Sequence, residues 1–93
     1  MLRHDNVLID RVVALPEQAR QRQNLTLSRD ETTGRSQRIE SMLTAELWED
    51  HGMLYLQVIA DSTQIIHEDG QSLVVPRGIY RVRVQREYTL LAS

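Results

Sequence analysis

The chain has no cysteine among its 93 residues, which excludes disulfides, thiolate zinc sites and a cysteine nucleophile. Lysine is also absent, so all eleven cationic side chains are arginine. There is no phenylalanine and only one tryptophan, so the core must be mainly aliphatic. No apolar run approaches the ~20 residues that span a bilayer, and charged residues interrupt the first apolar segment, unlike a signal peptide. We therefore expect a single cytoplasmic domain over residues 1–93 that does not contact a membrane.

Acidic residues are concentrated in the middle of the chain, although the net charge is only −2. Residues 39–70 hold seven acids and no arginine, whereas residues 1–38 hold seven arginines and five acids. Residues 71–93 hold four arginines and one acid. Nucleic-acid-binding domains usually carry a clear basic excess, so an acidic chain disfavours nucleic acid as the partner.

The second half of the chain alternates in the manner of β-strands. Leu54, Leu56 and Val58 fall on one side of a strand over residues 53–60, with Tyr55 and Gln57 on the other. Further turn signals follow near residues 61, 70 and 77, a spacing typical of an antiparallel meander. An earlier strand is predicted within residues 6–15.

Two short connections have the residues that hairpin turns require. His51-Gly52 makes a tight connection between two strand candidates, and Asp69-Gly70 tolerates the positive φ that hairpin turns require. The sequence therefore predicts an all-β fold, a small antiparallel barrel or sandwich.

Residues 36–50 also allow a helix. Ile39, Met42, Leu43 and Trp48 could share one helical face, with Ser36 as the cap. In that alternative the fold is α+β, with one short helix beside the same C-terminal sheet.

The segment "PRGIYRVRVQREY", residues 76–88, predicts a strand with a row of arginines. Alternation places Tyr80 and Val82 on the core side, and Arg81 and Arg83 on the opposite side. The arginines either pair across strands with acids of the middle block, or bind RNA phosphates beside a stacking tyrosine, Tyr80 or Tyr88. The negative net charge favours pairing, and the acids expected to provide it are Glu46, Glu49 or Glu68.

A metal site is the main catalytic alternative. His51 and His67 each lie beside carboxylates at a turn, which is the composition of a metal or acid–base site. If the two hairpins stack at one end, His51, His67 and Glu68 would converge as ligands of a cupin-like metal binder or metal-dependent enzyme. The chain has no nucleophile motif and no phosphate-binding loop, so we expect neither catalysis nor a cofactor.

Several segments resemble a family of small uncharacterised proteins from bacteria, archaea and mobile elements. The most specific resemblance is the final block, with Pro76, Gly78, Tyr80, Val82 and the run Gln-Arg-Glu-Tyr at residues 85–88. That family has a Thr-Gly-His-x-His segment and a His-Glu-x-His turn. Here Arg35, Gln37 and Gly70 occupy three of the histidine positions, and His67 and Glu68 remain. The resemblance implies that any metal held by those histidines is lost in this chain.

We therefore predict a non-catalytic binding or protein-interaction module, with an origin in phage or mobile elements. Its partner would be an unidentified protein, and self-association is left open. The expected contact residues are Arg81, Arg83, Arg86 and Tyr88.

Overall fold

The computed structural model describes residues 2–4, 7–29, 36–67 and 70–84, and these form strands, turns and loops without a helix. The described part therefore contains no helix that could cross a membrane. All strand pairs are antiparallel, which confirms the all-β prediction. The strands are β1 (Leu2–His4), β2 (Val7–Val12), β3 (Arg20–Gln21), β4 (Thr26–Arg29), β5 (Ser36–Ile39), β6 (Ala45–Asp50), β7 (Met53–His67) and β8 (Ser72–Val84).

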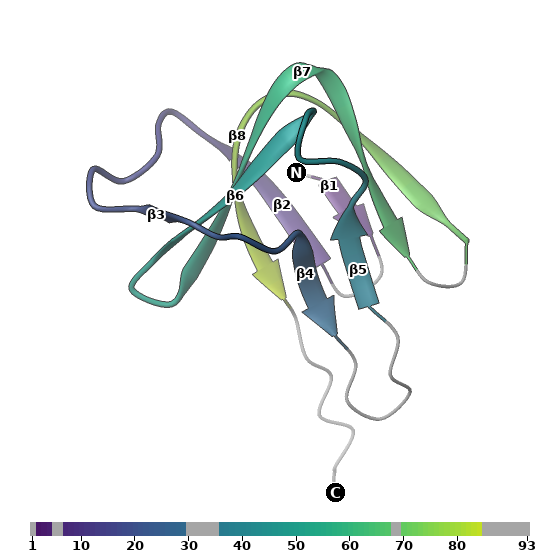
Figure 1. Cartoon of the computed structure of the whole chain (residues 1–93), viewed down its shortest axis with the longest axis horizontal. Helices are drawn as coiled ribbons and strands as arrows, with labels where there is room; N and C mark the ends of the chain where they lie inside the picture. Colours follow the sequence, from purple (N-terminus) through teal and green to yellow (C-terminus); the bar gives the residue numbers. More distant parts are fainter. Residues whose placement is uncertain (1, 5–6, 30–35, 68–69, 85–93) are drawn as a thin grey trace, which may run out of the picture.

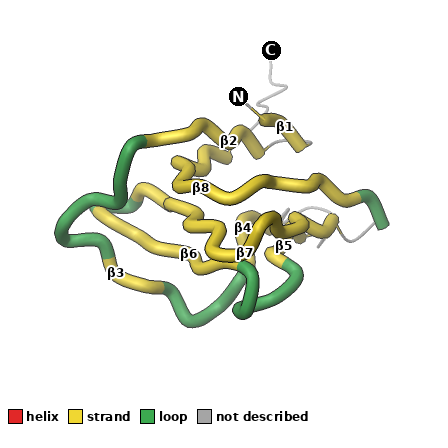
Figure 2. Tube along the Cα trace, turned by 90° about the horizontal axis from the view of Figure 1, so that it is seen from above, coloured by secondary structure: helices red, strands yellow, loops and turns green. Residues whose placement is uncertain are grey.

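One eight-stranded sheet curls into a half-barrel around the two longest strands, β7 and β8 (Figure 1). The C-terminal half of β8 pairs with β2, which pairs with β1, while the N-terminal half of β7 pairs with β6, which pairs with β3. We call these strands the first half of the sheet. In the second half, the C-terminal part of β7 pairs with β5, and β5 pairs with β4. Figure 2 shows β8 between β2 on one side and β7 on the other.

The turns expected near residues 61 and 77 are wrong, because β7 and β8 continue through both positions as bent strands. Their pairing shifts register between Val58 and Ser62 and then resumes with Ser62 opposite Pro76. Strands that pass from one half of a curled sheet to the other need such a bulge or bend. Residues that favour turns therefore form the corner of the sheet here.

Contacts between side chains and backbone stabilise this corner. Arg11 Nη2 donates to Arg77 O at 2.8 Å and to Tyr80 Oη at 3.1 Å, and Tyr80 Oη donates to Pro76 O at 2.7 Å. A Cβ atom at Gly78 would lie 2.9 Å from Arg11 Nη2, and the φ of Gly78 is 155°. The spacing of proline, glycine and tyrosine in the final sequence block therefore has a structural explanation at the corner.

The helix expected as an alternative over residues 36–50 is wrong, since β5 and β6 lie there with a turn between them. Thr44 closes that turn with hydrogen bonds from its amide and hydroxyl to Ser41 O, at 3.4 and 3.0 Å. Ala45 and Leu47 are buried, whereas Glu46 and Trp48 are only half-buried. This alternation every two residues is the period of a strand. Residues 36–50 thus form strands paired with β7, although their apolar residues also have the spacing of a helix.

The predicted hairpin turn at His51-Gly52 is confirmed. Their φ angles are 50° and 79°, so both central residues of the connection between β6 and β7 have positive φ. This is the pattern of a type I′ turn, whose twist matches that of the flanking strands. At the second hairpin Gly70 has a φ of 96° and donates its amide to His67 O at 2.9 Å, while Asp69 lies outside the described residues.

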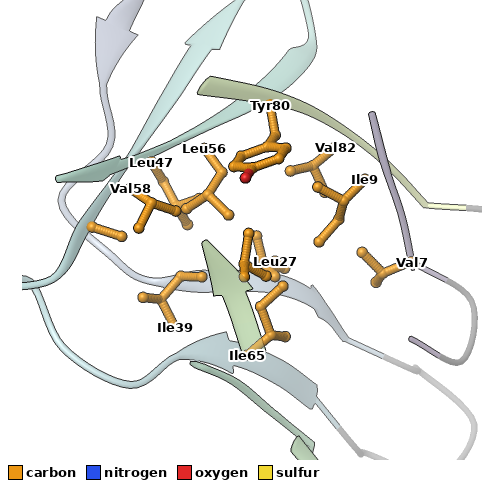
Figure 3. Packing of buried hydrophobic residues seen from close by; sticks show 12 residues of the cluster. Val7, Ile9, Leu27, Ile39, Leu47, Leu56, Val58, Ile65, Tyr80 and Val82 are labelled. Atoms are coloured by element: carbon orange, nitrogen blue, oxygen red, sulfur yellow. The ribbon is translucent and has the colours of Figure 1, made fainter. Parts of the chain in front are cut away.

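The core lies inside the curl of the sheet and is almost entirely aliphatic (Figure 3). Tyr80 is its one aromatic member among the described residues, and its hydroxyl is satisfied by the corner contacts. Thr63 is also buried, and its hydroxyl shares a 2.7 Å hydrogen bond with that of Thr44. Members from both halves of the sheet meet here, namely Val7, Ile9, Ala45, Leu47, Leu56, Val58, Tyr80 and Val82 from the first and Leu27, Ile39, Ile65 and Val75 from the second.

Candidate interaction face

The arginines of β8 point away from the core, as the alternation predicts. Tyr80 and Val82 are 3% and 4% exposed, whereas the side chains of Arg81 and Arg83 are 39% and 44% exposed. Val84, which the pattern places on the core side, is 40% exposed because it ends the described strand at the rim. Arg81 and Arg83 therefore lie on the outer face of the first half of the sheet.

The acid that pairs with these arginines is Asp10 on β2. Arg83 Nη2 donates to Asp10 Oδ2, and Arg81 Nη2 lies 3.9 Å from the same oxygen. Pairing within the molecule is thus confirmed, but the expected partners Glu46 and Glu49 are wrong. They lie on β6, which is separated from β8 by β7. Glu68 is outside the described residues.

Arg81 has one unsatisfied polar atom. Its Nε is buried and has no hydrogen-bond partner among the described residues. An unpaired buried donor costs about 1–3 kcal/mol relative to a satisfied one. Arg81 therefore lies between Asp10 and Tyr55 with part of its hydrogen-bonding capacity unused.

Strand register extends this site into a row across five strands. Asp10 is opposite Arg81, Arg81 is opposite Tyr55, Tyr55 is opposite Trp48, and Trp48 is opposite Gln21. Trp48 and Tyr55 are half-buried. They face outward, because their neighbours Leu47 and Leu56 are buried in the core and successive side chains of a strand point to opposite faces. We call this row, together with Arg83, the interaction face.

The aromatic pair is a feature that the sequence did not reveal. Alternation indicated that Tyr55 lies opposite the core-facing leucines, but nothing local places it beside Arg81 or Trp48. Cross-strand neighbours are far apart in sequence, so only the register brings them together.

Carboxylates lie beside the indole on β6. Trp48 Nε1 donates to Glu46 Oε1 at 3.3 Å, and Asp50 follows two residues later on the same side of the strand. Asp50 Oδ1 is 2.9 Å from Nδ1 of His51, whose side chain is 80% exposed at the hairpin turn.

The structure does not bring His51 and His67, the two described members of the predicted metal site, together. His51 precedes β7 and His67 ends it, so they are separated by the length of a 15-residue strand (Figure 1). Over the described parts of the chain, no group of three or more His, Cys, Asp or Glu side chains is placed to hold a metal ion. Glu68, the third expected ligand, lies in the gap at residues 68–69.

Two other positions from the family resemblance do lie near His67. Gln37 is its register partner on β5, and Gly70 donates its amide to His67 O. Gln37 and His67 are 1% and 7% exposed. Gln37, His67 and Gly70 therefore meet at this end of β7, and His67 is the one histidine among the three.

The remaining expected contact residues lie beyond the described strand. Arg86 and Tyr88 fall in residues 85–93, which the structure does not describe. Tyr80, one of the two tyrosines named for stacking in the RNA alternative, cannot stack on a nucleobase, because its side chain is buried in the core.

A family model for a domain of unknown function, DUF8820, matches residues 3–85. The chain belongs to the DUF8820 family. The match agrees with the resemblance to a family of uncharacterised proteins, and it covers all strands from β2 to β8. No curated protein and no solved structure matches the chain.

Proposed function

We propose that this domain is a non-catalytic binding module that recognises a protein partner through the interaction face. The observation that carries the proposal is the row in which Trp48, Tyr55 and Arg81 are neighbours on an outward-facing surface. Tryptophan, tyrosine and arginine are the residue types most enriched at the centres of protein interfaces. In a chain with four aromatic residues, two of them lie on this face.

The charges of the face support a protein rather than a nucleic acid. Arg81 and Arg83 are accompanied by Asp10, and Glu46 and Asp50 lie on the neighbouring β6. Phosphate binding requires a positive surface, because affinity arises largely from counterion release. A surface with both signs suits a protein partner, where complementary charges give specificity.

The test compares partner binding by variants with the same charge change on different surfaces. Arg81→Glu alters the interaction face, and Arg38→Glu is its matched control on β5, where Arg38 is exposed and its neighbours Gln37 and Ile39 are buried. Partners are captured from the source organism with the wild type and then purified for titration calorimetry. We expect Arg81→Glu and Trp48→Ala to weaken binding at least about tenfold, as interface hot spots do, while Arg38→Glu binds as the wild type.

Circular dichroism and thermal unfolding show whether each variant is folded. If a variant does not fold, crosslinking is used instead of it. A photo-crosslinking residue is placed at position 57 of the otherwise wild-type chain, in place of Gln57, and position 64, in place of Gln64, is the control. Capture of one partner from position 57 but not from 64 supports the proposal. Equal binding by all folded variants, or equal crosslinking from both positions, contradicts it.

A further inference from the structure

The hairpin of β6 and β7 has an outer surface whose charge is of one sign. Its outward-facing side chains include two carboxylates and no cation, and we call this set the hairpin surface: Glu46, Trp48 and Asp50 from β6, with Met53, Tyr55 and Gln57 from β7. The hairpin extends to one side of the molecule, with its turn at the tip (Figure 1). It lies within the stretch of residues 39–70 that contains no arginine and no lysine.

We propose that the hairpin surface docks a basic segment of the partner protein, with an arginine or lysine side chain over Trp48 and Tyr55. The inference rests on the proposed function and specifies the chemistry of the partner. Glu46 and Asp50 provide the complementary charge on either side of the indole.

Strand geometry gives the spacing that this docking needs. Residues two apart on a strand lie about 6.6–6.8 Å apart on the same side, so the carboxylates of Glu46 and Asp50 flank Trp48 along β6. Tyr55 is directly opposite Trp48 on β7, so the two aromatic side chains leave the sheet from neighbouring positions on the same face. A cation docked over this pair would therefore lie beside two aromatic side chains and between two carboxylates.

Local contacts hold the first carboxylate in place. The 3.3 Å hydrogen bond from Trp48 Nε1 to Glu46 Oε1 keeps this acid at the edge of the ring. Cations are attracted to the faces of tryptophan and tyrosine by the ring quadrupole, and arginine also stacks on them through its planar guanidinium. The indole of Trp48 and the carboxylate of Glu46 thus both favour a positive charge on the docked segment.

The arginines of β8 do not offset this charge at β6. β7 lies between β8 and β6, and Asp10 on the far side of β8 contacts both Arg81 and Arg83. An acidic segment would be attracted to β8 but repelled from β6. The aromatic pair and the carboxylates of Glu46 and Asp50 on β6 therefore favour a basic residue at Trp48.

The experiment uses Trp48 as its own reporter, because it is the only tryptophan in the chain. The full chain is titrated with a blocked peptide of alternating glycine and arginine, and separately with the same peptide carrying glutamate for arginine. We expect a saturable change in tryptophan emission with the arginine peptide only. Raising the salt concentration should weaken that binding, because exposed charges are screened.

Conservative variants identify the carboxylates responsible. Glu46→Gln and Asp50→Asn should each raise the dissociation constant about threefold to tenfold, in line with cation–π and ion-pair contributions at partly exposed sites. Glu40→Gln is the matched control, since Glu40 is exposed and lies in the turn between β5 and β6. It should leave the dissociation constant within about twofold, because a distant exposed charge is largely screened.

Three results would overturn the inference. These are no saturable change with the arginine peptide, equal affinity for the glutamate peptide, or equal effects of Glu46→Gln and Glu40→Gln. If partner binding is still lost in Trp48→Ala while Glu46→Gln and Asp50→Asn bind as the wild type, only the basic character of the partner is wrong. The proposed function itself would be contradicted by a different result: Trp48→Ala and Arg81→Glu would both bind the partner as tightly as the wild type does.

Discussion

Gly78 is the residue at which the corner of the sheet leaves least room for a side chain. The guanidinium of Arg11 and the hydroxyl of Tyr80 approach the position that a Cβ would occupy, at 2.9 and 3.2 Å. Both groups are held there by their own hydrogen bonds, to Arg77 O and Pro76 O respectively. A larger residue would have to displace this network or distort the bend.

Gly78→Ala should therefore lower the free energy of unfolding by about 1–3 kcal/mol, since strained backbone and a close contact act together. Urea unfolding followed by circular dichroism measures the change. The same substitution in an Arg11→Ala background should cost less, because the contacting guanidinium is gone. Equal costs in the two backgrounds would show that the approach of Arg11 is not the cause.

At the scale of elements, the β6–β7 hairpin depends on the conformation of its two turn residues. His51 is the one non-glycine residue with positive φ among the described residues. Asparagine tolerates that conformation, whereas β-branched side chains do not. This assigns His51 a role in the turn that does not depend on metal chemistry.

His51→Val should destabilise the protein by about 1 kcal/mol, and His51→Asn should leave it unchanged or stabilise it by up to about 0.5 kcal/mol. Thermal unfolding of the two variants beside the wild type provides the comparison. A valine variant as stable as the asparagine variant would mean that the turn conformation is not limiting at this position.

At the scale of the whole molecule, the arrangement of charges decides which partners are attracted. The net charge is −2, and Asp10 is the acid through which β2 neutralises the arginine row of β8. These ion pairs are substantially exposed, so their contribution to stability should be below about 1 kcal/mol. Their larger effect is on the electrostatic potential of the outer face.

Asp10→Asn should accordingly increase the affinity for single-stranded RNA while changing stability little. Fluorescence anisotropy with a labelled oligouridine across a range of salt concentrations measures both the affinity and its salt slope, which grows by about 0.7 per phosphate neutralised on single strands. Asp61→Asn is the control, because Asp61 pairs with Arg77 at 2.9 Å on the bend, and the charge change is the same. Equal RNA affinities of the two variants would show that Asp10 does not specifically shield the arginine row.

The sequence by itself determined the all-β class, the alternation of faces over residues 54–58 of β7 and residues 80–83 of β8, and the turn at His51-Gly52. These features depend on local properties, namely the two-residue period of a strand and the φ preference of glycine. The tertiary structure alone decided that Asp10 pairs with the arginines, that Trp48 and Tyr55 join their row, and that residues near 61 and 77 bend two continuous strands. Each of these depends on which strand lies beside which and in what register, and this is set by packing between residues far apart in the chain, which no local pattern records.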